Sequence, residues 1–239
     1  MKILIGAPVK QDEVVFRYYL KSLDTLDKGD HEVDYYFILH NSPELKQYLK
    51  EDQYEEYTNQ TTYEVADTHI WKDDNLRDVV KMKNKLLQLA VERGYDYFML
   101  VDSDLILHKN TLLHLLDQQK DIIGNIFWTR WETQQKEMPN AWYYDYYGFE
   151  SHEQIEALYQ KQITKVGYTG ACILIKSNVI NSGVNYSPIN NISWSNWEDR
   201  AFCIRAKVHG YDIWLSTYYR GIHLYRGEEV RQYESRGYK

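Results

Sequence analysis

Apolar and polar positions in the first half of the chain alternate between two periods. Short runs of β-branched and aromatic residues that end at turn residues predict strands, whereas apolar residues three or four positions apart predict helices. The predicted strands are 2–8, 34–39, 61–66, 95–101 and 121–127, and the predicted helices are 12–26, 44–57, 73–93 and 110–119. Because strand–helix–strand units form right-handed crossovers, this pattern predicts a doubly wound, mainly parallel sheet.

The second half of the chain is less regular. It predicts a strand with a glycine-rich entry, 165–176, a helix, 197–209, that ends at Gly210, and a final strand, 211–216. No internal repeat, linker or low-complexity segment divides the sequence. We therefore expect one α/β globule over residues 1–239, with a mixed, mainly parallel sheet flanked by helices.

The run 95–101 is aromatic and aliphatic without alternation, which is typical of a central parallel strand that is buried on both faces. Asp102-Ser103-Asp104 follows it directly, and ligands of such sheets bind beyond the carboxyl ends of the strands. Two carboxylates one residue apart repel each other unless a divalent cation neutralises them, and that cation can also bridge a diphosphate. A turn with two capping aspartates is the alternative interpretation. The buried strand before Asp102 and the apolar residues after Asp104 favour the metal.

One predicted helix carries a lysine where an apolar residue is expected. Along 73–93, Val79, Lys83, Leu86 and Ala90 lie on one face. Lys83 therefore interrupts the stripe that should face the sheet. Either the lysine extends from the edge of the stripe into solvent, or its ammonium faces a bound phosphate near the edge of the sheet.

An acidic pair opens the predicted helix 197–209. Glu198 and Asp199 stabilise the helix dipole in that position, and this needs no catalytic role. Beside the aromatic side chain of Trp197, the pair also offers a base near a sugar hydroxyl, which displacement at an anomeric carbon requires.

His223 follows the last predicted strand. A neutral imidazole is a good ligand for a transition metal, although a lone histidine is usually structural. Arg220 and Arg226 flank His223 and could bind diphosphate oxygens.

Composition narrows the function classes. The formal net charge of -7 argues against a nucleic-acid-binding protein, because such proteins concentrate positive charge. Tyrosine (23) and tryptophan (7) are abundant and gather at 127–149. Aromatic rings with polar tips suit carbohydrate, although a tyrosine-rich interface or an aromatic core gives the same pattern.

Compartment signals are weaker. Cys172 and Cys203 lie in apolar stretches, so we expect buried free thiols and a cytoplasmic protein. The short apolar start of the chain is interpreted as the first strand and not as a signal peptide. No run approaches the roughly 20 apolar residues of a membrane span, so we expect any membrane contact to be peripheral.

The order of these features resembles GT-A-fold glycosyltransferases, in particular enzymes similar to family 2. Three blocks carry the resemblance: KMKNKLLQLAVERGYDYFMLVDSDLIL, GYTGACILIKSNVI and WEDRAFCIRAKVHGYDIW. It implies a Rossmann-like GT-A domain and an enzyme of the hexosyltransferase type. The enzyme would move one sugar from a nucleotide-sugar, a UDP-sugar by default, to the hydroxyl of a glycan or other acceptor, with inversion. Residues 1–127 would bind the nucleotide-sugar, and residues 128–239 would bind the acceptor and supply the catalytic groups.

The resemblance also implies roles for the matching residues. Asp199 would be the general base, and Glu198 would help to hold the acceptor. Mn²⁺ or Mg²⁺ would be bound by Asp102, Asp104 and His223. Together with Arg226, the predicted nucleotide-binding residues are Ala7, Pro8, Val9, Lys83, Asn84, Asp102 and Ser103.

The chain departs from the family pattern after the second predicted strand. The turn there reads HNSPE, so Asn41 or Ser42 would replace the usual aspartate. No processive Q-x-x-R-W-type motif is visible, which favours transfer of a single sugar. A nucleotidyltransferase of related fold is the enzymatic alternative, but GAPVKQDE lacks the glycine-rich basic loop that such enzymes need. A non-catalytic carbohydrate-binding protein is the other alternative, and the α/β alternation argues against it because such modules are mostly β-sandwiches.

Overall fold

The computed structural model describes residues 1–60, 73–130, 136–144, 151–190, 197–225 and 227–237. The strands of the main sheet are β1 (Lys2–Val9), β2 (Glu32–His40), β3 (Tyr54–Tyr57), β4 (Tyr97–Val101), β5 (Leu105–Ile106), β6 (Ile122–Thr129), β7 (Met138–Pro139), β9 (Ile163–Val166), β11 (Cys172–Lys176) and β12 (Ile213–His223). A second small sheet pairs β8 (Ala141–Trp142) with β10 (Tyr168–Thr169). The helices are α1 (Glu13–Asp24), α2 (Asp73–Glu92), α3 (Thr111–Asp117), α4 (His152–Ala157), α5 (Ser177–Asn181), α6 (Glu198–Val208) and α7 (Gly227–Ser235), with the 3₁₀ helices η1 (Pro43–Tyr48) and η2 (Glu51–Gln53).

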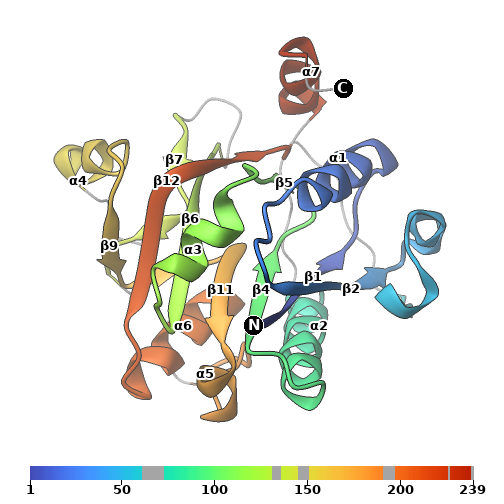
Figure 1. Cartoon of the computed structure of the whole chain (residues 1–239), viewed down its shortest axis with the longest axis horizontal. Coiled ribbons are helices and arrows are strands. Elements are labelled where there is room, and N and C mark those ends of the chain that lie inside the picture. Colours follow the sequence, from blue (N-terminus) through green and yellow to red (C-terminus); the bar gives the residue numbers. More distant parts are fainter. Residues whose placement is uncertain (61–72, 131–135, 145–150, 191–196, 226, 238–239) are drawn as a thin grey trace.

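The main sheet is mixed and mostly parallel along its first strands. Its order is β3-β2-β1-β4-β11-β6-β12-β5, with β7 beside β6 and β9 beside β12 (Figure 1). The strands β3, β2, β1 and β4 are parallel to one another, and β12 is parallel to β6. Between these two groups β11 runs antiparallel to both β4 and β6. The expected α/β fold class is therefore confirmed.

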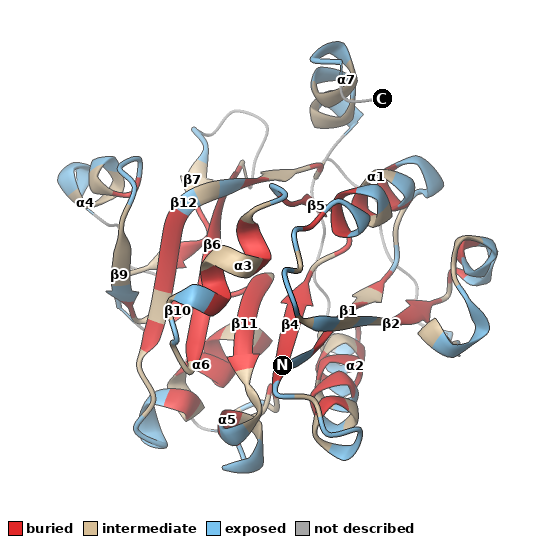
Figure 2. Cartoon of the chain, viewed as in Figure 1, coloured by how far each residue is buried: buried red, intermediate tan, exposed pale blue. Residues whose placement is uncertain are grey.

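Two apolar cores lie on opposite faces of this sheet. One core packs α2, α5 and α6 against the strands, and the other packs α1 and α3. Because successive residues of a strand point to opposite faces, Phe98 of β4 joins the first core and Met99 joins the second. All five residues of β4 are buried (Figure 2). The predicted central strand, buried on both faces, is thus confirmed, and it is parallel to β1 but antiparallel to β11.

The structure corrects the predicted helix 44–57. This segment forms η1, η2 and the strand β3, whose residues pair in parallel with β2. Backbone pairing with an available sheet edge outweighs the helical spacing of the segment, because tertiary context overrides local propensity. The predicted strand 61–66 lies outside the described residues.

The second half also differs from the predicted pattern. The segment 165–176 is divided among β9, β10 and β11, with breaks at Gly167 and at Gly170-Ala171. The final strand is longer than expected and runs through His223, and α7 follows it. Both cysteines are free and buried, as expected. In the described part of the chain, every helix is too short or too polar to cross a membrane.

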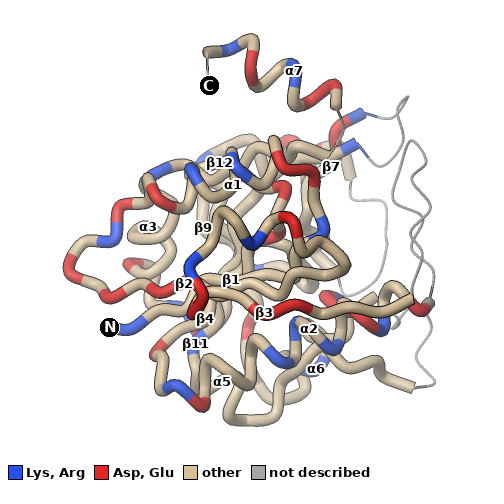
Figure 3. The backbone as a smooth tube through the Cα atoms, turned by 90° about the vertical axis from the view of Figure 1, so that its right-hand side faces the viewer, with Lys and Arg blue, Asp and Glu red and all other residues tan. Residues whose placement is uncertain are grey.

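Exposed charges pair across α2 and β3. Lys85 of α2 forms an ion pair with Glu55 of β3, and Figure 3 shows basic positions of α2 beside acidic positions of β3. The side chain of Lys85 is 59% exposed. Such surface pairs contribute only about 0–1 kcal/mol, so this contact orients the edge strand without determining the fold.

The two cores give a test of the position of β4. Phe98→Ala should lower the free energy of unfolding by about 3–5 kcal/mol and Met99→Ala by about 2–5 kcal/mol, because each leaves a cavity in a different core. Val208→Ala, at a position that is 80% exposed, is the control and should stay within about 0.5 kcal/mol. Urea unfolding measures all three, and a wild-type midpoint for either β4 variant would contradict the central position of the strand.

Candidate functional site

Asp102 follows β4 in a turn that several hydrogen bonds hold. Its N–H donates to the Ala171 carbonyl at 2.7 Å, and its carbonyl accepts from the N–H of Leu105 at 3.0 Å. The buried hydroxyl of Tyr19 on α1 donates to the Val101 carbonyl at 2.8 Å. These contacts place Asp102 at the carboxyl end of β4, between β1 and β11, where an α/β sheet binds its ligands.

Lys83 is buried on α2, with only 2% of its side chain exposed. Its Nζ donates to Glu198 Oε1 and to Asp199 Oδ1, each at 2.8 Å. The same Nζ lies 5.3 Å from the centroid of the Tyr186 ring. The interpretation that Lys83 extends into solvent is therefore wrong. The ion pairs join α2 to the first turn of α6.

Asp199 lies against the chain between β10 and β11. A Cβ atom built on Gly170 would lie 2.0 Å from Asp199 Oδ2, so only glycine allows the carboxylate to approach this closely. The backbone of the next residue, Ala171, lowers the pKa of this carboxylate slightly. Ala171 has a φ of 62°, in the left-handed region. The segment Gly170-Ala171 thereby contacts both acidic motifs, because the Ala171 carbonyl accepts from Asp102 while Gly170 lies against Asp199.

The carboxylates of this cluster share one buried cation. Burial raises the pKa of Asp102 to about 7, with Lys83 opposing the shift and Asp199, Asp104 and Glu198 adding to it. Burial also raises the pKa of Asp199 to about 6, again against Lys83 and with Glu198 adding to it. For Lys83, burial by itself lowers the pKa, but Asp199, Glu198 and Asp102 outweigh it and raise the pKa well above its usual value. Lys83 therefore stays cationic, whereas Asp102 and Asp199 change charge near neutral pH.

Asp104 and His223 contact each other across the same edge. His223 is the last residue of β12, and its Nε2 lies 3.1 Å from Asp104 Oδ2. Its Nδ1 lies 2.9 Å from Oγ1 of Thr129, the last residue of β6. The N–H of Leu224 donates to the Asp104 carbonyl at 2.8 Å. Strand pairing thus brings together two of the three predicted metal ligands.

The chemistry of this pair fits a divalent cation. Carboxylate oxygen and imidazole nitrogen are both ligands of Mn²⁺, and a metal-binding histidine usually has its second ring nitrogen held by a polar neighbour, as Thr129 holds Nδ1 here. A cation would also offset the burial and, to a lesser extent, the neighbouring carboxylates that raise the pKa of Asp102. Within the described residues, no three side chains of His, Cys, Asp or Glu lie close enough together to hold a metal. The metal therefore stays a prediction.

The predicted nucleotide contacts begin at the end of β1. Ala7 and Val9 are fully buried there, and Pro8 is partly exposed. Ser103, which follows β4 along the chain, is also buried. Because β1 pairs with β4, the ends of these two strands lie next to each other. Arg226 lies outside the described residues.

Asn84 holds the chain after α5. Its Oδ1 accepts from the N–H of Tyr186 at 2.7 Å, and its Nδ2 donates to Ser187 Oγ at 3.0 Å. Asn84 and its neighbour Lys83 thus both connect α2 to the second half of the chain. Their predicted contact with a nucleotide stays a prediction.

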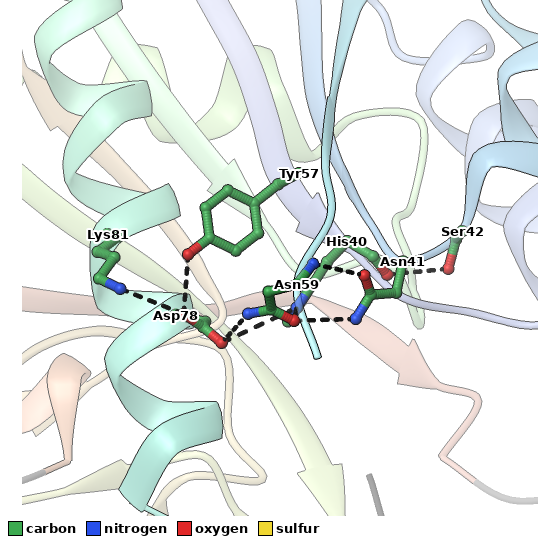
Figure 4. A network of polar contacts seen from close by, with 7 residues as sticks. All are labelled: His40, Asn41, Ser42, Tyr57, Asn59, Asp78 and Lys81. Atoms are coloured by element: carbon green, nitrogen blue, oxygen red, sulfur yellow. Dashed lines mark hydrogen bonds and ion pairs between the residues drawn. The ribbon is translucent and has the colours of Figure 1, made fainter. Parts of the chain in front are cut away.

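A separate polar network lies at the carboxyl ends of β2 and β3 (Figure 4). The Tyr57 hydroxyl donates to Asp78 Oδ1 at 2.9 Å, and Asn59 Nδ2 donates to the other Asp78 oxygen. Asn59 and Asn41 exchange two hydrogen bonds, each of 3.0 Å. His40 Nε2 lies 3.2 Å from Asn59 Oδ1, and burial lowers the pKa of His40. The network ties both strand ends to α2.

Sequence reasoning missed most of this network. It named Asn41 and Ser42 as replacements for the usual aspartate, and Asn41 does take part, with a left-handed φ of 48°. It did not name Asp78, because an acid near the start of a helix is ordinary. It did not name His40 or Asn59 either, since residues from a strand and a loop form no motif. Their burial is visible only in the folded chain.

Described parts of the aromatic stretch form stacked pairs. Trp128 stacks on Tyr159 with ring centroids 4.1 Å apart, and Trp142 stacks on Tyr168 at 4.6 Å. Trp128 is buried, which agrees with the alternative of an aromatic core, whereas Tyr144 is 54% exposed. A role of this stretch in holding an acceptor stays a prediction.

Comparison with known proteins agrees with this fold. The chain matches the family model described as glycosyltransferase family 25, N-terminal domain, over residues 25–211, which is more than half of its length. The structure of S. aureus TarS 1–349 in complex with UDP is similar, with a TM-score of 0.56 and 14% identity, over 92% of this chain and 60% of that chain. Its complex with UDP-GlcNAc has a TM-score of 0.54 and 14% identity, over 92% of this chain and 58% of that one. A197 from STIV has a TM-score of 0.50 and 12% identity, over 93% of this chain and 85% of that chain.

These structures share the fold at low sequence identity, and this chain spans about 60% of the length of TarS 1–349. No curated protein sequence matches significantly. The family match covers the acidic motif after β4 and the start of α6, so the expected resemblance to GT-A-fold glycosyltransferases is confirmed. The chain belongs to the family of the glycosyltransferase family 25 N-terminal domain, and it is a glycosyltransferase with a GT-A-like fold.

Proposed function

We propose that this enzyme moves one sugar from a UDP-sugar to a hydroxyl acceptor, with inversion, and that it depends on a divalent metal. The observation that carries the proposal is the double contact of Gly170-Ala171. The Ala171 carbonyl accepts from the N–H of Asp102, and the backbone of Gly170 lies against the carboxylate of Asp199. A candidate base is thereby held beside the acidic motif of the donor site. The complexes of TarS with UDP and with UDP-GlcNAc support a uridine nucleotide as the donor.

Asp199 is the candidate general base of this reaction. It would accept the proton of the acceptor hydroxyl while the hydroxyl oxygen attacks the anomeric carbon of the donor. The bond from that carbon to the diphosphate oxygen breaks on the opposite side, which gives inversion. Glu198 is the candidate for holding the acceptor, and its side chain is 10% exposed.

Asp104 and His223 would hold Mn²⁺ or Mg²⁺, with Asp102 close to the metal or the ribose. Bound there, the cation would neutralise charge on the departing nucleoside diphosphate. The other residues proposed to line the nucleotide are Ala7, Pro8, Val9, Asn84, Ser103 and Arg226. The acceptor is proposed to be a glycan or another molecule with a free hydroxyl.

A first test follows nucleoside diphosphate release from a panel of sugar nucleotides, with and without Mn²⁺. We expect turnover with a UDP-sugar, loss of turnover on chelation, and a decrease of about 100-fold or more in Asp104→Asn, because a metal ligand is lost. Asp121→Asn, which changes an exposed acid paired with Lys176, is the matched control and should keep wild-type turnover. Full turnover of Asp104→Asn in the presence of a chelator would overturn the metal assignment.

The raised pKa of Asp199 predicts an acid limb in the rate profile. A base must be ionised, so kcat should fall about tenfold per pH unit below about pH 6 and level off above about pH 7. The raised pKa also means that the folded protein binds the proton of Asp199 more tightly than the unfolded chain does. The stability gained from this protonation is fully present below the unfolded carboxyl pKa of about 4, and it is lost as pH rises through about 6. In Asp199→Asn we expect kcat to fall by about 10²–10⁴ and the limb to disappear, while calorimetry shows unchanged UDP binding. A variant that keeps near-full transfer would exclude Asp199 as the base.

Gly170 gives a third test. Gly170→Ala places a methyl group where Asp199 Oδ2 lies, so the carboxylate must move, and we expect kcat to fall by about 10²-fold. Gly94→Ala is the control for adding a methyl group, because nothing lies within 4 Å of the added Cβ atom. Alanine is strained at a φ of 72°, so this variant also shows how far a loss of stability by itself affects kcat. Equal kcat values in Gly170→Ala and wild type would show that the position of Asp199 does not limit turnover.

A further inference from the structure

The surroundings of Lys83 differ from those expected of a lysine that binds phosphate, because its ammonium is buried and already paired with carboxylates. Its ammonium is buried between α2 and α6, and its side chain is 2% exposed. Two of its three donors are used on Glu198 and Asp199, at 2.8 Å each. The ring of Tyr186, which stacks on Phe202 with centroids 4.6 Å apart, lies 5.3 Å from Nζ. The amine therefore faces the interior of the protein.

The position of the amine has a physical cost that demands a counter-charge. A buried ammonium is strongly destabilising unless carboxylates surround it with good geometry. The carboxylates of Glu198 and Asp199 on α6 likewise destabilise the fold if no cation lies beside them. Lys83, Glu198 and Asp199 therefore stabilise one another only in this arrangement, and a displacement of any one leaves charge uncompensated.

The same contacts determine the orientation of Asp199. Lys83 binds Oδ1, and the backbone of Gly170 lies against Oδ2 from the β10–β11 side. Neighbours on both oxygens restrict the rotamers that the Asp199 carboxylate can adopt. A base in a fixed orientation is worth a large rate factor, because small displacements of reacting groups slow the reaction.

We propose that Lys83 is a positioning residue for Asp199: it is a buried counter-ion that holds the base in its working orientation from inside the protein, and it does not bind the diphosphate. This inference rests on the proposed function of Asp199 as the base. It assigns Lys83 to the acceptor side of the reaction, whereas the sequence resemblance placed it on the nucleotide side.

The test compares Lys83→Met and Lys83→Arg with Lys85→Met. Lys85 is on the same helix and pairs with Glu55 at the surface, so it is the matched control for removing a lysine from α2. In Lys83→Met we expect kcat to fall by about 30-fold or more while the Kd of UDP, measured by calorimetry, stays within about threefold. Lys83→Arg keeps the charge with a different shape and should recover part of kcat. Lys85→Met should match wild type in both quantities.

Two results would overturn the inference. A Kd of UDP that rises tenfold or more in Lys83→Met, with kcat little changed, would assign Lys83 to the diphosphate. Unchanged kcat and Kd with only a lower melting temperature would leave Lys83 a structural residue. A double-mutant cycle with Asp199→Asn adds a check, because Lys83→Arg should cause little further loss of kcat once the base is absent, and additive losses would contradict the proposal. Lys83→Arg serves for the whole comparison where Lys83→Met does not fold.

A structural readout separates this inference from the proposed function. Crystal structures of wild type and Lys83→Met should show the Asp199 carboxylate turned away from Gly170 in the variant, and Lys83→Arg should restore part of its wild-type orientation. An unmoved carboxylate would overturn the positioning role even where transfer is observed. If the wild type transferred no sugar from any sugar nucleotide, the proposed function would be refuted. The crystal structures would still show whether Lys83 determines the orientation of Asp199.

Discussion

A buried ammonium between two carboxylates is the constraint on which the carboxyl edge of this sheet depends. Lys83 is 2% exposed and binds Glu198 and Asp199, which are more than a hundred positions away along the chain. An unpaired charge in that place would be strongly unfavourable, so α2 and α6 can pack fully on their shared face of the sheet only with all three groups in place. The ion pairs therefore couple the packing of the two halves of the chain to the geometry of the site.

The antiparallel strand β11 brings the remaining parts of the site to that edge. In a sheet of parallel strands, an antiparallel strand begins where its neighbours end. The entry to β11, Gly170-Ala171, consequently lies beside the end of β4, where Ala171 accepts from Asp102 and Gly170 lies against Asp199. The strands β6 and β12 are parallel and end at the same edge, so Thr129 and His223 lie side by side there. A topology that is only partly parallel thus gathers acid, base and imidazole on one side of the sheet.

Helix α2 supports two polar arrangements that differ in kind. Lys83 and Asn84 connect it to α6 and to the chain after α5, whereas Asp78 connects it to the ends of β2 and β3. In the first arrangement burial raises the pKa of Asp102 and Asp199 toward neutrality, and the charge of Lys83 opposes that shift. The second satisfies buried amide and hydroxyl groups around one carboxylate. Both fix strand ends where a ligand of an α/β sheet is expected.

The sequence by itself determined the features that have a local signal. Uniform apolar character predicted the buried strand β4, the 3.6-residue period predicted α2, and the order of acidic motifs predicted the GT-A-like fold. The odd position of Lys83 on that helix was also visible, since a cation in an apolar stripe breaks the period. Only the tertiary structure decided where its charge goes, that 54–57 pairs as a strand, and that Asp78, Asn59 and His40 meet. The physical reason is common to all three: hydrogen bonds and ion pairs between distant segments depend on which backbone edges and buried charges the fold brings together, and no period along the chain records that.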